Sequence, residues 1–600
     1  MFVREKTSGP HTYLQIVENR REGGKTRQRV VASLGRVETL LASGALDRLI
    51  RSACRFSEKV VALAEDSGRS GEAVAESRSI GPGLVFERLW RTTGCHEVLR
   101  AALAGRRFRF DVERAVFLTV LHRLFHTESG SDRDAGSWQR DYRIAGVGEV
   151  GLHHLYRAMA WLGEALPGQP EGEASPRCVK DLLEEELFAR RRTLFSRDAL
   201  VFFDTTSVFF TGEGGARLGE RGFSKDHRPE CKQLVLGMVL DRDGRPVCSE
   251  VWPGNTNDVS TLARVARRLE ERFGMLRVCV VADAGMISRK VVGKLEAMGW
   301  DYILGTGLRR TAEVKNRVLA DPEPFEVVAW TPRRKKRNGE VREPEPKLEV
   351  KEVVVKTTRP DGGILSNRYV VCRNPIQARR EAASRAELVK KLPGMLRDQG
   401  AKALLKNRAV TRLLKARKGA YVLDREALAE APKYDGIWVL RTNTELDVKD
   451  VALRYKQLWM VERTFRTAKS LLDTRPVFHQ TDAAIRGHMF CSFLALTLQK
   501  ALFERLEQAE LRESWNDIVR DLRAVTETEI EQDHKRLAVR SRITETAAGV
   551  FRAVGLRIPP VIRQLPRRTQ PAVTQASGNG APATPRNPPK CGATDSRHKP

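Results

Sequence analysis

Two aspartates lie where apolar strands are expected, and they are the first residues with obvious chemical potential. Asp204 is inside the run DALVFFDTTSVFF, and Asp283 directly follows VCVVA. A carboxylate in an apolar strand is costly to desolvate unless it has a partner, and a metal ion is a common one. Two carboxylates on neighbouring strand ends could therefore hold Mg²⁺. Each also has an ordinary alternative, because Asp204 could bond the neighbouring backbone and Asp283 could cap a helix that begins near Ile287.

A third acidic residue comes from the segment YKQLWMVERTFRTAKSLL, which has a helical pattern. In a continuous helix Glu462 would lie about 20° from Tyr455, with Arg466 and Lys469 within about 40° of it. On such a stripe the carboxylate could bind a metal ion at one phosphate while the cations contact the neighbouring phosphates. The alternative is an ordinary solvated face in which Glu462 and Arg466 form an i,i+4 pair. The spacing by itself slightly favours this alternative.

The charge balance favours a polyanionic partner. The 600 residues contain 105 Lys and Arg against 76 Asp and Glu, a net charge of +29 with a pI near 10.0. Cations that neutralise phosphates release condensed counterions, so nucleic acid is the expected partner. The alternative is a basic surface that only keeps the protein soluble. The imbalance is strongest in the region that opens with the cluster Arg333–Arg337, where Ile376–Lys418 carries 13 Lys and Arg against 3 Asp and Glu.

Other compositional signals exclude several classes of protein. The longest nearly uncharged apolar stretch, Met489–Leu498, is about half of the roughly 20 residues that span a bilayer, so we expect no membrane partner. The N-terminus lacks the apolar run of a secretory signal, which predicts a cytoplasmic protein. Nine cysteines without a CxxC pair argue against a zinc ribbon or a disulfide framework. The absence of GxxxxGK[ST] means that no energy-rich nucleotide is implied.

The elements that must position these residues follow from hydrophobic periodicity. Alternation around Gly23-Gly24 predicts an N-terminal hairpin, and a helical pattern extends from about residue 80 to 192. From Asp198 the order is strand, strand, strand, helix, strand, helix, strand, which implies a mixed sheet covered by helices. A basic, strand-rich stretch interrupts this pattern, and helices resume from Val448. The tail after Gln564 is rich in Pro, Gly, Ala and Thr, so we expect it to be disordered.

These patterns divide the chain into six regions. We predict an N-terminal β-hairpin and helix, a helical domain for DNA binding or dimerisation, a catalytic core in two parts separated by an insertion domain, and a disordered tail. The hairpin region is 1–50 and the helical domain is 80–195. The two parts of the core are 196–307 and 447–560, and the insertion between them is 308–446. The tail is 565–600.

Several segments, in this order, resemble one family of proteins. They are FFDTTSVFF, GFSKDHRPECKQLVLGMVLDRDGRPV, the GNTND loop, VVADAGM, DGIWVLRTN and YKQLWMVERTFRTAK, which together span about Ala199 to Lys469. The chain resembles bacterial insertion-sequence transposases of the DDE type, in the insertion sequence four superfamily and its group numbered sixteen thirty-four. The family signature Tyr, two residues, Arg, three residues, Glu, six residues, Lys matches at Tyr455, Glu462 and Lys469, but Leu458 replaces the Arg.

The resemblance implies a fold and a set of site residues. The fold would be α/β, with a ribonuclease H-like mixed sheet, flanking helices and a β-rich insertion, preceded by the hairpin region and the helical domain. Asp204, Asp283 and Glu462 would be catalytic and would bind two Mg²⁺ or Mn²⁺ ions. Trp438 would occupy the place of a tryptophan that stacks on a flipped base, although packing is at least as good an interpretation. We assign the remaining DNA contacts to Tyr455, Arg466, Lys469, Lys225 and Arg228.

The activity implied is DNA transposition. Water would attack a phosphodiester at each element end, and the resulting 3′-hydroxyl would attack target DNA, with one metal activating the nucleophile and one stabilising the leaving oxygen. The partners would be the terminal inverted repeats, target DNA and a second copy of the chain, which would form a homodimer in the DNA complex. The protein would be cytoplasmic and associated with the bacterial nucleoid. Two alternatives stay open from the sequence: a catalytically inactive end-binding factor or inhibitor, and a ribonuclease H-like nuclease without strand transfer.

Overall fold

The computed structural model describes most of the chain in two units. The described residues are 2–22, 25–46, 74–125, 138–148, 150–169, 173, 175–191, 198–275, 277–309, 311–328, 348–358, 364–398, 408–417, 420–471, 475–532 and 535–566. One unit comprises Met1–Glu76, Glu529–Val539 and Ile562–Pro600, and the other comprises Ser77–Thr528 and Arg540–Val561. The second unit contains both aspartates.

The N-terminal segment is a three-stranded antiparallel sheet. The expected hairpin is present as β2 (His11–Glu22) and β3 (Lys25–Arg36), and β1 (Phe2–Ser8) adds a strand that the sequence analysis did not predict. Its Gly23-Gly24 turn lies outside the described residues. The helix α1 (Val37–Ala42) follows.

A second small sheet has the order β18-β17-β16-β4. It consists of β4 (Val74–Ser79), β16 (Thr526–Gln532), β17 (Lys535–Arg540) and β18 (Ile562–Leu565). Because Leu565 pairs with Arg536, ordered structure extends past the start that we expected for the tail. The rest of the expected tail, residues 567–600, lies outside the described residues.

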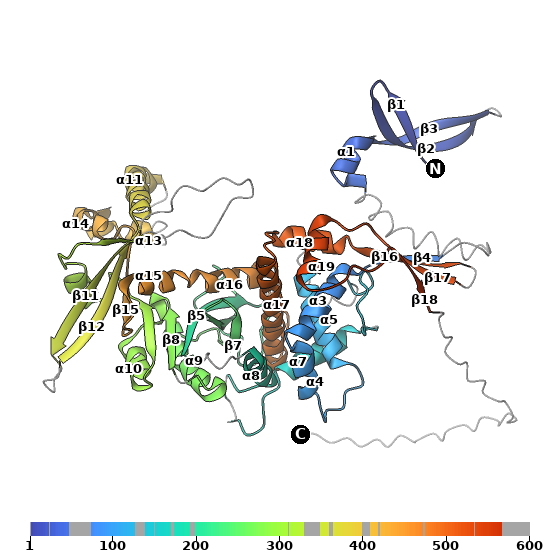
Figure 1. The fold of residues 1–600 in the computed structure, drawn as a ribbon. Helices are drawn as coiled ribbons and strands as arrows, with labels where there is room; N and C mark the ends of the chain where they lie inside the picture. Colours follow the sequence, from blue (N-terminus) through green and yellow to red (C-terminus); the bar gives the residue numbers. More distant parts are fainter. Residues whose placement is uncertain are drawn as a thin grey trace, which may run out of the picture. The chain divides into compact units, whose positions relative to one another are not determined.

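The helical region is completed by a helix from the far end of the chain. Its elements α3 (Gly81–Thr92), α4 (Cys95–Ala102), α5 (Val112–Phe125), α7 (Leu152–Leu162) and α8 (Val179–Arg191) match the helical periodicity. The long α17 (Asp482–Gln508) packs against α5 and α7 (Figure 1). A Cβ at Gly487 would clash with the Met159 carbonyl oxygen, so glycine permits this close approach. The helices α18 (Trp515–Arg523) and α19 (Glu545–Ala553) follow.

The central sheet has the element order that its sequence predicts. It begins with β5 (Asp198–Phe209), β6 (Gln233–Asp241) and β7 (Pro246–Pro253), followed by α9 (Asp258–Phe273), β8 (Arg277–Ala282), α10 (Arg289–Ala297) and β9 (Asp301–Gly305). The nine strands lie in the order β10-β11-β12-β15-β9-β8-β5-β6-β7. β8 is parallel to both β5 and β9, whereas the other described pairs are antiparallel, so the sheet is mixed.

Helices cover both faces of this sheet. Val201, Phe203 and Val280 belong to an apolar core with α9 and α10. The alternate residues Phe202 and Val281 belong to the core that includes α15 (Val448–Lys456) and α16 (Trp459–Leu471). Because successive side chains of a strand point to opposite faces, a two-sided apolar strand needs this double cover. Figure 1 shows α15 and α16 running past β5 and β8.

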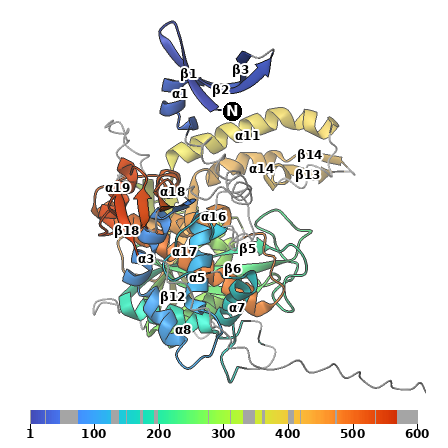
Figure 2. The ribbon, with the colours of Figure 1, turned by 90° about the vertical axis from the view of Figure 1, so that its right-hand side faces the viewer.

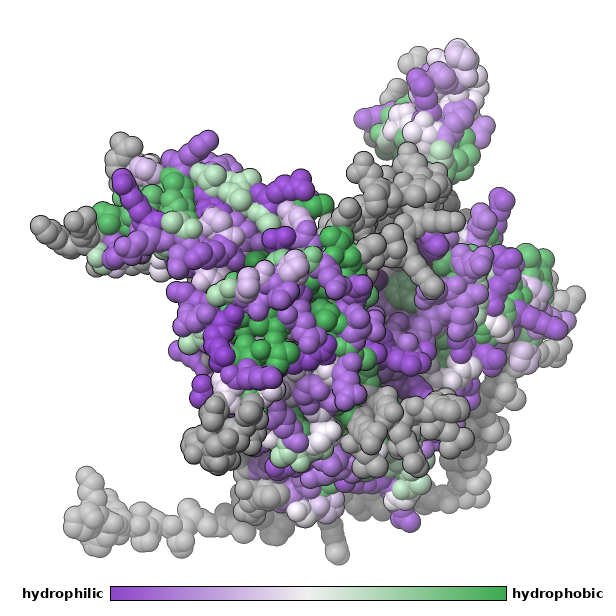
Figure 3. Space-filling view, turned by 60° about the vertical axis from the view of Figure 1, so that its left-hand side comes forward, coloured by the Kyte–Doolittle hydropathy of each residue, from purple (hydrophilic) through white to green (hydrophobic). Residues whose placement is uncertain are grey.

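The segment 308–446, predicted as an insertion domain, adds strands to the central sheet. Its strands β10 (Glu326–Val328), β11 (Leu348–Thr358), β12 (Ile364–Arg373) and β15 (Ile437–Thr442) continue from β9, to which β15 pairs. Its helices α11 (Pro375–Asp398), α13 (Arg408–Thr411) and α14 (Arg425–Glu430) and the hairpin of β13 (Leu414–Arg417) and β14 (Ala420–Leu423) form a separate layer (Figure 2). The basic cluster Arg333–Arg337 lies outside the described residues. Among the coloured residues in Figure 3, hydrophilic ones predominate, with hydrophobic patches between them.

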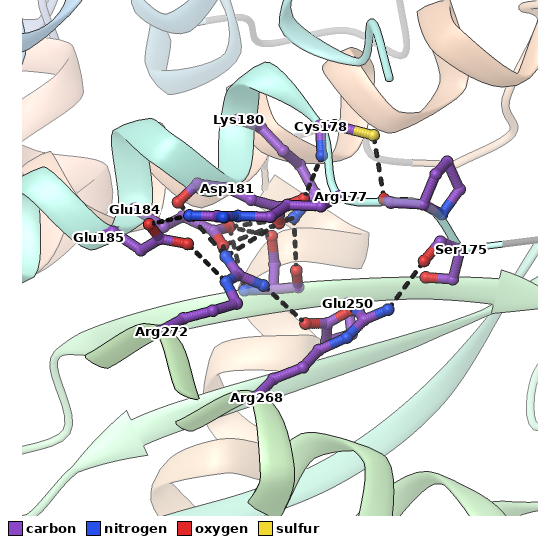
Figure 4. Close-up of polar contacts among 12 residues, drawn as sticks. Ser175, Arg177, Cys178, Lys180, Asp181, Glu184, Glu185, Glu250, Arg268 and Arg272 are labelled. Atoms are coloured by element: carbon purple, nitrogen blue, oxygen red, sulfur yellow. Dashed lines mark hydrogen bonds and ion pairs between the residues drawn. The ribbon is translucent and has the colours of Figure 1, made fainter. Parts of the chain in front are cut away.

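A buried ionic network ties α8 to the central sheet (Figure 4). Lys180 Nζ contacts Asp181 Oδ1 at 2.6 Å and the Ser249 carbonyl of β7 at 2.7 Å. Arg272 of α9 contacts Asp181 at 3.2 Å. Burial raises the pKa of Glu184 to about 7, whereas burial is outweighed at Asp181 by Lys180 and Arg272, which hold its pKa below the usual range.

We expect Arg272→Met to destabilise the protein strongly. The side chain of Arg272 is 7% exposed, and removing one partner of a buried charge network costs about 3–5 kcal/mol because the remaining carboxylates lose their counter-charge. Denaturant unfolding measures this loss. The matched control is Arg264→Met, an exposed arginine on the same helix, which should change the unfolding free energy by less than about 0.5 kcal/mol. Equal effects of the two substitutions would contradict the assignment.

Candidate active site

Asp204 and Asp283 lie side by side at the ends of two parallel strands. β5 and β8 pair with Phe203 opposite Ala282, so the next residue of each chain segment is an aspartate at the same level. Asp283 has extended backbone angles, so the alternation of faces continues through it. Both carboxylates therefore point to the face of the sheet that α15 and α16 cover. The predicted pairing of these residues thus follows from the strand register.

The environment of Asp204 makes its negative charge costly. Burial, with smaller contributions from the carboxylates of Asp283 and Asp258, raises the pKa of Asp204 to about 6, although the charge of Lys225 and the Thr205 N–H oppose this rise. The Thr205 backbone N–H donates to Asp204 Oδ1 at 2.7 Å, so one oxygen of Asp204 does bond the neighbouring backbone, as in the alternative role considered from the sequence. No cation among the described residues forms an ion pair with Asp204. A bound cation would relieve this unfavourable charge.

Asp283 is held by a tyrosine. The Tyr455 hydroxyl donates to Asp283 Oδ1 at 2.9 Å. Burial, followed by the charge of Asp283, raises the pKa of Tyr455, so this hydroxyl stays a donor. The Asp283 carboxylate does not cap a helix, because Ser288 supplies the cap of α10 by accepting from the Val291 N–H. The alternative role of Asp283 as a helix cap is therefore wrong.

The helix that carries Glu462 is not continuous with the helix of Tyr455. A turn at Gln457 and Leu458 separates α15 from α16, so the continuous helix on which the expected stripe depends is not present. Leu458, at the position of the family arginine, is 6% exposed and packs in the apolar core. An apolar residue suits this position because a guanidinium would lose its hydration there.

Glu462 is exposed on α16, which packs on the same face of the central sheet as Asp204 and Asp283. Val461, Phe465 and Ala468 of α16 are buried in the core that includes Phe202 of β5. Glu462 itself is exposed to solvent. Within the described ranges, no three His, Cys, Asp or Glu side chains are grouped closely enough to hold a metal ion. The structure thus brings Asp204 and Asp283 together and leaves Glu462 outside their cluster.

The donor chemistry of the aspartate pair fits a divalent metal. Carboxylate oxygens are the ligands that Mg²⁺ prefers, and Asp204 combines burial with a neighbouring carboxylate, as metal ligands commonly do. Asp283 is exposed, so an ion can reach the pair from solvent.

Lys225 is part of a network beside Asp204. Its Nζ donates to the Thr205 carbonyl at 2.7 Å and contacts Asp258 Oδ2 at 3.2 Å. The Thr205 hydroxyl donates to Asp258 Oδ1 at 2.7 Å. The sequence analysis assigned no role to Asp258, although it ends the GNTND segment that carries the resemblance. Lys225 is therefore tied to the site's own residues.

Lys469 is paired rather than solvated. Its Nζ contacts Asp226 Oδ1 at 2.8 Å, and Arg475 Nη1 contacts the same oxygen at 2.6 Å. The side chain of Lys469 is 11% exposed, and burial lowers its pKa. The solvated-face alternative is therefore wrong for Lys469. Arg466 is exposed on α16.

Two comparisons with family models decide the family. The model described as IS1634 family transposase, N-terminal domain matches residues 2–66, and the model described as transposase DDE domain matches residues 196–498, just over half of the chain. The chain belongs to the IS1634 family of DDE transposases. The second match covers both aspartates, Glu462 and the predicted insertion.

Other comparisons add less. One similar solved structure is a piggyBac transposase synaptic complex with hairpin DNA, at 9% identity and a TM-score of 0.36, covering 74% of this transposase and 79% of that chain. A search among curated proteins gives no match. No described helix of the transposase is both long enough and apolar enough to cross a membrane.

The remaining expected DNA contacts of the transposase differ in exposure. Arg228 is exposed, pairs with Glu230 at 3.3 Å and lies over the Phe209 ring at 5.7 Å. Trp438 lies in β15 opposite Cys372 and packs half-buried against the core, with Lys456 Nζ 5.9 Å from its ring centroid. The described contacts of Trp438 are those of a packing residue, and its stacking on a base stays a prediction.

Gly305 is needed for the position of Tyr455. A Cβ at Gly305 would lie 2.5 Å from the Tyr455 hydroxyl and 2.9 Å from the Ala284 backbone nitrogen. We expect Gly305→Ala to displace Tyr455 from Asp283, costing about 1–3 kcal/mol of stability and reducing DNA cleavage. Thermal unfolding and a cleavage assay test this. The control is Gly293→Ala on α10, where no atom lies within 4 Å of the added Cβ. A fully stable and active Gly305→Ala enzyme would contradict it.

Proposed function

We propose that this transposase cleaves DNA at the ends of its insertion sequence and joins the freed 3′-hydroxyl to target DNA. The observation that carries the proposal is the in-register pair Asp204 and Asp283 on parallel strands, within the segment that matches the DDE domain. Water would break the phosphodiester bond and leave a 3′-hydroxyl and a 5′-phosphate. That hydroxyl would then attack a target phosphodiester in the same manner.

The aspartates and Glu462 would hold divalent metal ions, Mg²⁺ or Mn²⁺, two in number. Such ions, when bound, activate an attacking oxygen and stabilise a leaving oxygen. Asp204 and Asp283 would supply adjacent carboxylates, and Tyr455 would orient Asp283 through its hydroxyl. Glu462 would contribute from α16, which packs on the same face of the sheet.

The partners proposed are the terminal inverted repeats, target DNA and a second copy of the chain. The net charge of +29 supports a polyanionic partner. A cleavage assay on the element's own end DNA tests the function, and adding a second duplex distinguishes strand transfer from cutting alone. Binding of end DNA without cleavage at any divalent metal concentration would instead indicate an inactive end-binding factor.

The identity of the third carboxylate can be tested directly. Asp258 is an alternative to Glu462, because its charge acts on Asp204. We expect Glu462→Gln to leave no detectable cleavage, while Asp258→Asn, which alters a supporting contact, costs about 10- to 100-fold. Both variants should still bind end DNA. The reverse ranking of the two cleavage rates would place Asp258, not Glu462, in the site.

A further inference from the structure

One carboxylate of the transposase lies between two cations beside the candidate site. Asp226 belongs to the loop that joins β5 to β6, Lys469 is near the end of α16, and Arg475 follows that helix. Lys469 Nζ and Arg475 Nη1 both contact Asp226 Oδ1, at 2.8 Å and 2.6 Å. The contact therefore joins segments about 240 residues apart in the chain.

In this contact one positive charge is not neutralised, and one carboxylate oxygen of Asp226 has no hydrogen-bond donor among the described residues. The side chain of Asp226 is 7% exposed, yet its Oδ2 is buried and accepts no hydrogen bond from any described residue. Two cations face one carboxylate, so the group has a net positive charge. Lys225 lies close enough to act electrostatically on Lys469. The guanidinium groups of Arg228 and Arg475 both lie over the Phe209 ring, at 5.7 Å and 6.0 Å.

A phosphodiester suits this group of cations better than the carboxylate does. It carries the same single negative charge and offers more acceptor oxygens, and charge-assisted bonds from lysine and arginine are strong. The loop residues that follow Asp226, 227–230, are exposed to solvent. We propose that Asp226 occupies the place of a DNA backbone phosphate between Lys469 and Arg475 in the DNA-free protein, and that DNA binding displaces it.

This inference rests on the proposed function, because it requires DNA at this face. The competing explanation is a structural latch, in which Asp226 only fastens the loop to α16. The two explanations predict opposite effects of removing the charge. A placeholder competes with DNA, so its removal tightens binding. A latch orders the DNA-binding loop, so its removal weakens binding or folding.

The test measures binding of the full-length protein to a labelled duplex carrying the element's end sequence, by fluorescence anisotropy without divalent metal. Asp226→Asn is expected to bind about 3- to 30-fold more tightly than the wild type, because the cations no longer exchange one anion for another. The matched control is Asp243→Asn. Asp243 pairs with Arg245 at 3.0 Å in the turn after β6, at the opposite end of that strand, so the same charge is removed away from the site.

Two further variants test whether the tighter DNA binding of Asp226→Asn depends on Arg475. Arg475→Gln should weaken binding, and the double variant Asp226→Asn with Arg475→Gln should lose the gain, since the phosphate site is then incomplete. Unchanged or weaker binding by Asp226→Asn, a gain equal to that of Asp243→Asn, or a failure of Asp226→Asn to fold would overturn the inference. If the wild type itself does not bind the duplex, the proposed function fails instead.

Discussion

Replacing Asp204 with asparagine is expected to abolish DNA cleavage and, at neutral pH, to stabilise the metal-free transposase. The first effect follows from loss of a metal ligand beside Asp283. The second follows from burial, which raises the pKa of Asp204 to about 6 from an unfolded value near 3.8. Above pH 6 the ionised carboxylate therefore costs the folded state about 2–3 kcal/mol, which a neutral amide avoids. Asparagine also retains the oxygen that accepts from the Thr205 N–H.

The stability gain of Asp204→Asn is expected to depend on pH. Because the pKa of Asp204 is higher in the folded state, protonation favours folding, and the cost disappears as the pH falls from 6 toward 4. The stability gain of Asp204→Asn, measured by thermal unfolding in EDTA, should thus be largest at pH 7.5 and close to zero near pH 4. Asp283→Asn is the control: it should also lose cleavage, with a smaller gain because Asp283 is exposed. Near wild-type cleavage by Asp204→Asn would remove Asp204 from the site.

The second large effect concerns salt. A net charge of +29 and a DNA-facing role for several cations predict that affinity for DNA falls by roughly 10³-fold or more between 50 and 200 mM salt. A double-logarithmic plot of the binding constant against salt concentration measures the number of phosphates neutralised. Arg228→Gln, which removes an exposed cation, should make the slope shallower by about one phosphate contact.

A control and a contrary result complete this experiment. Arg91→Gln removes an exposed arginine that pairs with Glu87 on α3, so it changes the net charge equally. Its slope should match that of the wild type if α3 does not face the DNA. A flat salt titration of the wild type would show that the positive charge serves solubility only.

The sequence by itself determined the elements of the central sheet and the two aspartates within it. Continuous apolar runs rich in β-branched and aromatic residues identified β5 and β8, and a charged residue in an apolar strand is conspicuous because its burial costs free energy. The order of strands and helices from Asp198 to Gly305 required no long-range information. The family resemblance, carried by ordered motifs, gave the DDE transposase assignment that the family models confirm.

Only the tertiary structure decided how distant segments meet. The pairing of β15 with β9, the packing of α17 among the N-terminal helices and the contact of Lys469 with Asp226 all join residues far apart in the chain. Periodicity reports which face of an element is buried but not what covers that face. The turn at Leu458 shows the same limit locally. Helical spacing placed Tyr455 and Glu462 on one continuous helix, but the chain forms two helices there. Leu458 packs in the core at the turn between them, and Tyr455 of the first helix bonds to Asp283.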